Sequence, residues 1–154
     1  MNTVLNNAMI MATKETFKAV IGTGIQSSTP VEQPINGQQV DTSVIISFVG
    51  AISGAFTLRC SKEMGASLAS KMLGMEVDPD SDDMKDAIGE FFNMIVGASK
   101  GYVESSSDPF KMSCPTTIVG GDYTVHIKAT PNATVAHIPF SCDGDELSIE
   151  IFLN

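Results

Sequence analysis

The chain contains no tryptophan, only two histidines, and three cysteines that form no CxxC pair. Zinc sites usually draw on closely spaced pairs of cysteine or histidine ligands, and His126 and His137 are not spaced in that way. An odd number of cysteines also does not fit a disulfide framework. Cys60, Cys114 and Cys142 therefore predict a reducing compartment and small, buried thiol side chains.

Basic residues are scarce, because 9 lysines and arginines stand against 18 aspartates and glutamates, which gives a net charge of −9. An acidic surface argues against a partner that is nucleic acid, and it disfavours adsorption to an anionic membrane. No apolar run approaches the length that spans a bilayer, and residues 1–10 lack the features of a signal peptide. The expected location is the cytoplasm.

Several common catalytic signatures are also missing. The sequence has no glycine-rich phosphate loop and no nucleophile elbow, so a small-molecule enzyme finds little support. The acidic segment that starts at Asp78 superficially resembles a calcium loop. An EF-hand would need glycine at its sixth position and glutamate at its twelfth, where this chain has Asp83 and Gly89, so we reject a calcium site.

The length of 154 residues and the hydrophobic content of 43% predict a single domain over residues 1–154. Helical periodicity predicts helices over residues 4–21, 61–75 and 82–100, with Gly22 ending the first. Residues 24–39 are rich in turn residues and are predicted to form a loop. Ser81 or Asp82 is expected to cap the third helix.

Alternating apolar residues predict the strands. Residues 40–49 and 56–60 are expected to form a hairpin, and later strands are expected over 115–119, 123–129, 135–142 and 147–153. Pro139 inside one of these strands argues for an edge or a bulge. The order favours an α+β fold, with a mostly antiparallel sheet and helices packed on one face.

The helix over residues 82–100 has two opposite faces. One is an apolar stripe, the ordinary face that packs on a core: Met84, Ile88, Phe91, Ile95 and Ala98. The other holds Asp86, Glu90, Asn93, Gly97 and Lys100. Glu90 and Asn93 are three residues apart and are therefore neighbours on the helix surface. The polar face is either an ordinary solvated surface or a flat docking surface that carries two functional groups.

The run Asp86-x-x-x-Glu90-x-x-Asn93-x-x-x-Gly97 resembles the signature of the CheC/CheX/FliY family of chemotaxis phosphatases. The wider pattern over residues 89–100 looks most like the CheX branch. The opening helix, the hairpin that ends near Cys60, the helix before the motif and the strand entry over 115–120 are also similar to that branch. The resemblance therefore spans nearly the whole chain.

This resemblance implies that the chain removes phosphate from the aspartyl phosphate of a CheY-type receiver. Asn93 would orient the attacking water, and Glu90 would pair with the receiver's active-site lysine. Asp86, Gly97 and Lys100 would complete the surface that docks the receiver. The receiver would supply the phosphoaspartate and the Mg²⁺, so no cofactor is expected to be bound by this chain.

Some members of the family carry the Glu-x-x-Asn pair twice, whereas Glu90 is the only one of eight glutamates here with asparagine three positions later. The resemblance therefore implies one site per chain and a homodimer. Two interpretations stay open: a phosphatase, or a non-catalytic module that docks a signalling receiver. Two interpretations also stay open for Gly97: it lets a partner approach the helix closely, or it serves simple helix packing.

Overall fold

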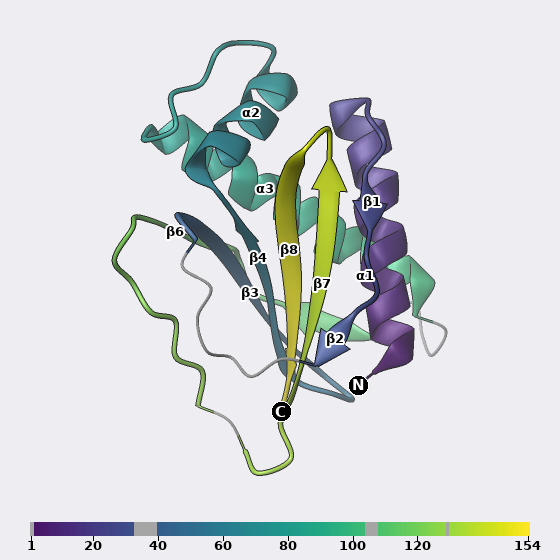
Figure 1. The fold of residues 1–154 in the computed structure, drawn as a ribbon. Helices are drawn as coiled ribbons and strands as arrows, with labels where there is room; N and C mark the ends of the chain where they lie inside the picture. Colours follow the sequence, from purple (N-terminus) through teal and green to yellow (C-terminus); the bar gives the residue numbers. More distant parts are fainter. Residues whose placement is uncertain (1, 33–39, 104–107, 129) are drawn as a thin grey trace.

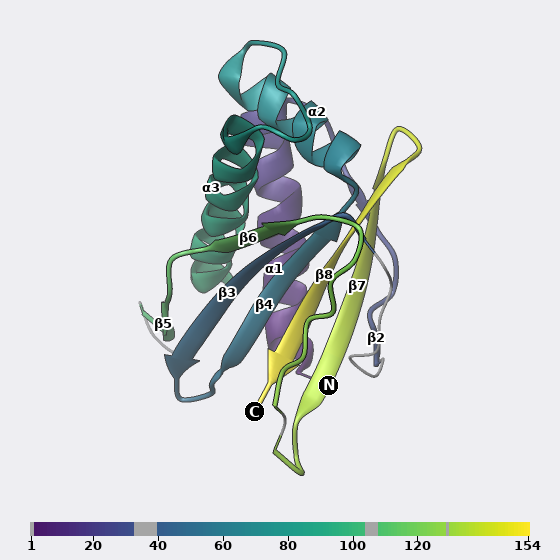
Figure 2. The ribbon, with the colours of Figure 1, turned by 90° about the vertical axis from the view of Figure 1, so that its left-hand side faces the viewer.

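The computed structural model describes residues 2–32, 40–103, 108–128 and 130–154. The described chain forms one eight-stranded sheet. The strand pairings between these residues are antiparallel. The helices lie on one side of this sheet (Figure 1, Figure 2). This arrangement confirms the predicted α+β fold with a mostly antiparallel sheet and helices on one face.

Four long strands form the middle of the sheet in the order β7-β8-β4-β3. They are β3 (Thr42–Gly50), β4 (Gly54–Cys60), β7 (Thr134–Cys142) and β8 (Asp145–Leu153). Their register aligns four buried residues, Val44, Leu58, Ile149 and Ile138, in one row across the sheet. Such rows give the sheet the apolar face on which the helices pack.

Short strands extend the sheet on both sides. β5 (Phe110–Met112) and β6 (Thr116–Val119) pair with β3, while β1 (Gln26–Ser27) and β2 (Val31–Glu32) pair with β7. The prediction of a continuous loop over residues 24–39 is therefore wrong for residues 26–27 and 31–32, and residues 33–39 lie outside the described residues. Pro139 lies next to the sheet edge, between the two stretches of β7 that pair with β1 and β2. Proline has no N–H to donate to a neighbouring strand, which favours such a position.

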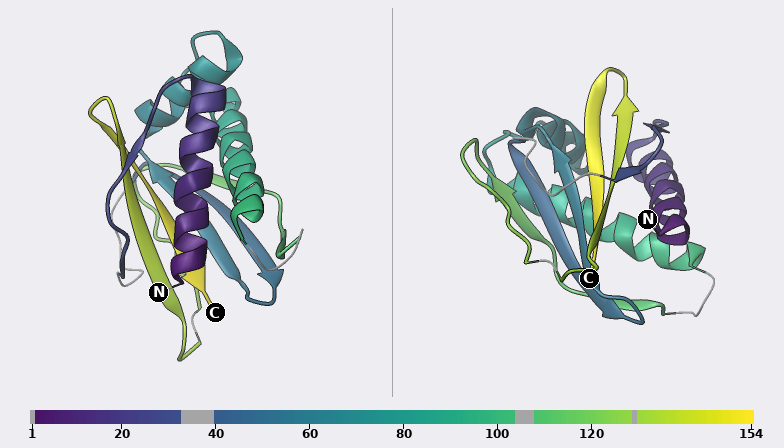
Figure 3. Two further views of the ribbon diagram at one scale, coloured as in Figure 1. Left: turned by 90° about the vertical axis from the view of Figure 1, so that its right-hand side faces the viewer. Right: turned by 60° about the horizontal axis from the view of Figure 1, so that its bottom comes forward.

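The helices begin and end close to their predicted positions. α1 (Thr3–Thr16) continues through a π-helical turn, η1 (Phe17–Ile21), and stops at Gly22, whose φ of 82° favours glycine. α2 spans Lys62–Leu73, and α3 spans Asp82–Ser99 before a 3-10 turn, η2 (Lys100–Tyr102). α1 and α3 lie side by side over the sheet (Figure 3).

The predicted strand over residues 123–129 is wrong for residues 123–128, and Ala129 lies outside the described residues. This segment belongs to no strand of the sheet, although it keeps the predicted alternation of half-buried and exposed side chains. The Tyr123 hydroxyl lies 2.8 Å from Ser43 Oγ, so that the segment is held against β3 by a side-chain contact. Alternation reports one-sided packing, which occurs here without a backbone ladder.

The three thiols are free, as the sequence predicts, but only Cys60 is buried. Cys114 is exposed and Cys142 is intermediate, which corrects the expectation of three buried side chains. Burial, and secondarily the charge of Asp41, raises the pKa of the Cys60 thiol to about 12, so this group stays protonated and unreactive near neutral pH.

Candidate functional site on helix α3

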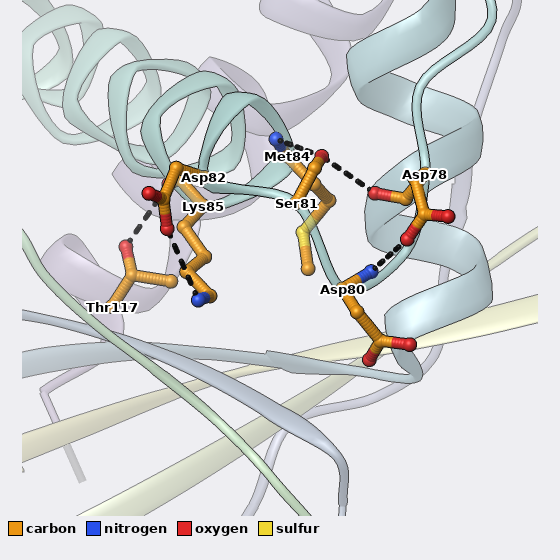
Figure 4. A network of polar contacts seen from close by, with 7 residues as sticks. All are labelled: Asp78, Asp80, Ser81, Asp82, Met84, Lys85 and Thr117. Atoms are coloured by element: carbon orange, nitrogen blue, oxygen red, sulfur yellow. Dashed lines mark hydrogen bonds and ion pairs between the residues drawn. The ribbon is translucent and has the colours of Figure 1, made fainter.

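A compact network of polar contacts fixes the start of α3 (Figure 4). Ser81 Oγ accepts a hydrogen bond from the Met84 N–H at 3.2 Å and donates one to the Asp78 carbonyl at 2.7 Å. The Asp78 carboxylate accepts from the Asp80 N–H at 2.8 Å. Ser81 is thus the cap, one of the two predicted candidates, and the preceding loop is folded onto the helix.

The buried face of α3 determines which side of the helix points outward, to within a small rotation about the helix axis. Met84, Ile88, Phe91 and Ile95 are fully buried, as the apolar stripe predicts, and Ala98 is partly buried. The Phe91 ring meets Phe17 edge-on, with ring centroids 5.2 Å apart. Because this face is held in the core, the opposite side of the helix has to point outward.

The outward side carries the predicted polar residues. Asp86 and Glu90 are exposed, and Asn93 is of intermediate exposure. Residues three apart on a helix have Cβ atoms roughly 5–6 Å apart, so Glu90 and Asn93 present a carboxylate and a carboxamide side by side. Asp82 and Asp83 add two exposed carboxylates in the first turn, next to the positive end of the helix dipole.

Gly97 continues the same face one turn beyond Asn93. A methyl group built on Gly97 would meet no described atom within 4 Å. Helix packing therefore does not explain this glycine within the described chain, and of the two interpretations left open by the sequence, close approach by a partner is the one that this geometry suits.

The Lys100 side chain interacts with other residues of the same chain. Its ammonium forms an ion pair with Asp108 at 2.9 Å and lies 5.3 Å from the centroid of the Phe110 ring. Hydrogen bonds from Lys111 and Lys100 lower the pKa of the Asp108 carboxyl to about 2, so that it stays ionised. The lysine side chain is thereby held against Asp108 and Phe110 and is only 23% exposed.

The segment before and within β6 packs on α3, which the sequence analysis did not predict. A methyl group on Gly89 would lie 3.1 Å from Thr117 Oγ1 and 3.6 Å from Pro115 Cγ. The Thr117 hydroxyl donates a hydrogen bond to the Lys85 carbonyl at 3.2 Å. A buried glycine in mid-helix, directly before Glu90, was the one available signal of this close approach.

The comparison with protein families places this geometry in a known context. The family model described as chemotaxis phosphatase CheX matches residues 42–141, about two thirds of the chain and the whole of α3. The chain belongs to the CheX family of chemotaxis phosphatases. The comparison with curated proteins found no match.

Solved structures share the CheX fold over the full chain. A putative chemotaxis protein from Desulfovibrio vulgaris Hildenborough is 25% identical with a TM-score of 0.85, covering 99% of this chain and 98% of its own. The chemotaxis protein CheX from Vibrio vulnificus is 22% identical with a TM-score of 0.85, covering 97% and 99%. A CheX–CheY–BeF3–Mg²⁺ complex from Borrelia burgdorferi matches with a TM-score of 0.76 at 20% identity, covering 97% of each chain.

On the outward face of α3, Glu90 is exposed and Asn93 is half-buried. A cavity of about 480 Å³ lies instead beside β4, β7 and β8, with Arg59 and His137 in its wall and neither Glu90 nor Asn93 among its lining residues.

No group of three metal-ligating side chains occurs within the described residues. None of the helices in the described ranges is long and apolar enough to cross a membrane.

Proposed function

We propose that this protein hydrolyses the aspartyl phosphate of a CheY-type receiver that docks on the exposed face of α3. The observation that supports this most strongly is the pairing of Glu90 and Asn93 on an outward face in a chain of the CheX family. A relative has been crystallised with CheY, BeF3 and Mg²⁺, which supports a receiver as the partner. The proposed place of action is the cytoplasm.

The openness of this face suits a partner better than a small substrate. Small-molecule sites are usually concave and bury most of the ligand, whereas Glu90 and Asn93 lie on the convex side of a helix. A docked receiver would cover the face and exclude bulk water from the phosphate. Each protein would then contribute part of the site.

Asn93 is proposed to orient the attacking water. A carboxamide both donates and accepts hydrogen bonds without changing its protonation state, so it can hold a water in one orientation. Phosphoryl transfer depends mainly on positioning and on electrostatic stabilisation, and an oriented water near phosphorus removes much of the entropic barrier. The half-buried position of Asn93 limits the freedom of its side chain before the partner arrives.

Glu90 is proposed to pair with the receiver's active-site lysine. An exposed carboxylate is well hydrated before docking, and a charge-assisted hydrogen bond formed on docking sets the register of the two proteins. Asp86, Gly97 and Lys100 are proposed to border the docked partner. The receiver's Mg²⁺ would neutralise phosphate charge, and its ligands would come from the receiver.

We also propose a homodimer with one site per chain. The resemblance to the CheX branch supports it, and so does the segment over residues 123–128, which pairs with no strand described here. Sedimentation equilibrium of the purified protein measures the mass directly, and a monomer at micromolar concentration would contradict the proposal.

The direct test is the decay of a phosphorylated CheY-type receiver in the presence of Mg²⁺, with and without this protein. Catalytic acceleration at substoichiometric amounts of the protein is the expected result. Saturable binding to the phosphorylated receiver without acceleration would replace the phosphatase with a non-catalytic docking module. Neither binding nor acceleration, across the receivers of the source organism, would contradict both.

A Glu90→Gln substitution keeps the shape of the side chain and removes its charge. Hydrogen bonds to charged groups are worth roughly 1.5–3 kcal/mol, so we expect kcat/KM to fall by roughly 10- to 100-fold, mostly through KM. The salt dependence of KM should also weaken. Glu76→Gln, which makes the same charge change on the exposed linker before α3, serves as the control.

A Gly97→Ala substitution is expected to separate stability from docking. The added methyl meets no described atom, and alanine in a helix is favoured over glycine by about 1 kcal/mol, so Tm should rise. The same methyl would stand between α3 and the receiver and raise KM several-fold. An unchanged KM with a raised Tm would remove Gly97 from the docking surface.

A further inference from the structure

We infer that Gly89 and Thr117 are positioning residues for this site, because they fix the rotation of α3 that aims Glu90 and Asn93 at the partner. The inference rests on the proposed function above. Neither residue is placed on the exposed face or in contact with the receiver, so the role of each is exerted through the helix.

The contact lies directly beside the proposed functional pair. Gly89 precedes Glu90 in the chain, and Asn93 follows Gly89 by four residues, about 40° further around the helix axis. Gly89 is buried under β6 and the residue before it, since a methyl group at this position would have Thr117 Oγ1 and Pro115 Cγ at 3.1 and 3.6 Å. The helix therefore approaches this segment closely at the turn that carries the site.

A hydrogen bond stabilises this close contact between α3 and β6. The Lys85 carbonyl is the acceptor for the Gly89 amide within α3, and it also accepts the Thr117 hydroxyl at 3.2 Å (Figure 4). Thr117 is itself held by the sheet, because it is in register with Val44 in the pairing of β6 with β3. The sheet is thus hydrogen-bonded to α3 at the Lys85 carbonyl, which also accepts the helical hydrogen bond of the Gly89 amide.

Packing on the core alone still allows a small rotation of α3 about its axis. Side-chain tips lie roughly 5–6 Å from the axis of a helix, so a rotation of about 10° moves them by about 1 Å. A misplacement of about 1 Å can cost about 100-fold in rate when a catalytic group has to be aligned. The contact of Gly89 with Thr117 lies on the flank of α3 next to the outward face, where it opposes such a rotation.

Two substitutions test the inference by different physical routes. Gly89→Ala inserts a methyl 3.1 Å from Thr117 Oγ1, so that α3 or the Thr117 side chain has to shift. Thr117→Val removes the hydrogen bond while keeping the branched shape. Thr117→Ser retains the hydroxyl and should restore near-normal behaviour. Gly24→Ala, at a position with no described atom within 4 Å of the new methyl, is the matched glycine control.

We expect Gly89→Ala to lower kcat for receiver dephosphorylation several-fold, with KM changed less than threefold. Thr117→Val should lower kcat several-fold, and Thr117→Ser and Gly24→Ala should leave it near the wild-type value. A purely structural role would instead lower Tm and leave kcat per folded molecule unchanged, which would overturn the inference.

A second readout does not depend on activity. The side-chain amide signals of Asn93 in a ¹⁵N-correlated NMR spectrum, assigned by their loss in Asn93→Ala, should shift in Gly89→Ala and Thr117→Val but not in Gly24→Ala. Unshifted signals would overturn the inference. If the wild-type protein accelerates no receiver, the proposed function fails, and these signals still decide whether Gly89 and Thr117 position Asn93.

Discussion

Replacing Asn93 with alanine should lower kcat for receiver dephosphorylation by about 100-fold or more, because the attacking water loses the amide that orients it. Receiver affinity should change little, since Glu90 and the rest of the exposed face remain. The measurement is the single-turnover decay of the phosphorylated receiver at saturating concentrations of the variant, which separates the chemical step from binding.

The fold should tolerate this change. Asn93 is an intermediate-exposure residue inside α3, and alanine has a higher helix propensity than asparagine by roughly 0.5 kcal/mol, so Tm should be unchanged or slightly raised. Asn7→Ala, which replaces an exposed asparagine within α1, makes the same change in propensity away from the proposed pair. Lost activity together with retained stability would locate the effect in chemistry.

Two results would contradict the proposed role. Acceleration that survives Asn93→Ala would mean that another group orients the water, although the phosphatase itself would stand. A loss of receiver binding equal to the loss of rate would mean that Asn93 serves docking. Either result would redirect attention to Glu90, its neighbour on the helix surface.

The parts of the fold that the sequence predicted are those with local causes. α3 is recognisable from its apolar stripe, its Ser81 cap and its acidic first turn, all within one continuous segment. The strands of residues 135–142 and 147–153 show a clear alternation, and the structure pairs them as β7 and β8. Local periodicity suffices where an element packs one face on the core.

The errors arose where the outcome depends on distant partners. β1 and β2 are two residues each and exist because β7 offers its free edge, which no pattern within residues 24–39 reveals. The segment over 123–128 alternates like a strand, yet no described strand lies in register beside it. Whether an extended segment joins a ladder is decided by the rest of the sheet.

The same distinction applies to the site. Spacing alone predicts that Glu90 and Asn93 are neighbours, because both lie on one helix, whereas their proposed roles come from the resemblance to the CheX branch. Thr117 lies 28 positions after Gly89 in the sequence, and only the folded sheet brings its hydroxyl to the Lys85 carbonyl. A residue that acts on a site from another element gives little signal in the sequence, and here that signal is a single mid-helix glycine.

The core side of the same helix should show the largest effect on stability. Phe91 is fully buried, and its ring meets Phe17 edge-on at 5.2 Å between centroids. Phe91→Ala should lower the free energy of unfolding by about 3–5 kcal/mol, the range for truncating a buried phenylalanine. Met94→Ala, on the same helix but 38% exposed in the wild type, should cost far less.

The pairing with Phe17 adds a sharper test. Phe17 begins the turn η1 that ends the first helix, so the two rings join the end of α1 to the middle of α3. In a double-mutant cycle with Phe17→Ala, we expect a coupling energy of roughly 0.5–1.5 kcal/mol from the aromatic contact. Urea unfolding of the four proteins measures it, and purely additive effects would argue against a direct contact.

Phe91 also connects stability with activity, because it lies in the chain between Glu90 and Asn93 while pointing to the opposite side of α3. Its burial fixes which residues face outward, and its loss should loosen the helix on the sheet. Phe91→Leu, which keeps much of the apolar volume, should restore most of the stability yet still allow small changes in rotation. A kcat for Phe91→Leu below the wild-type value, at temperatures where the protein is fully folded, would show that core packing helps to aim the exposed pair.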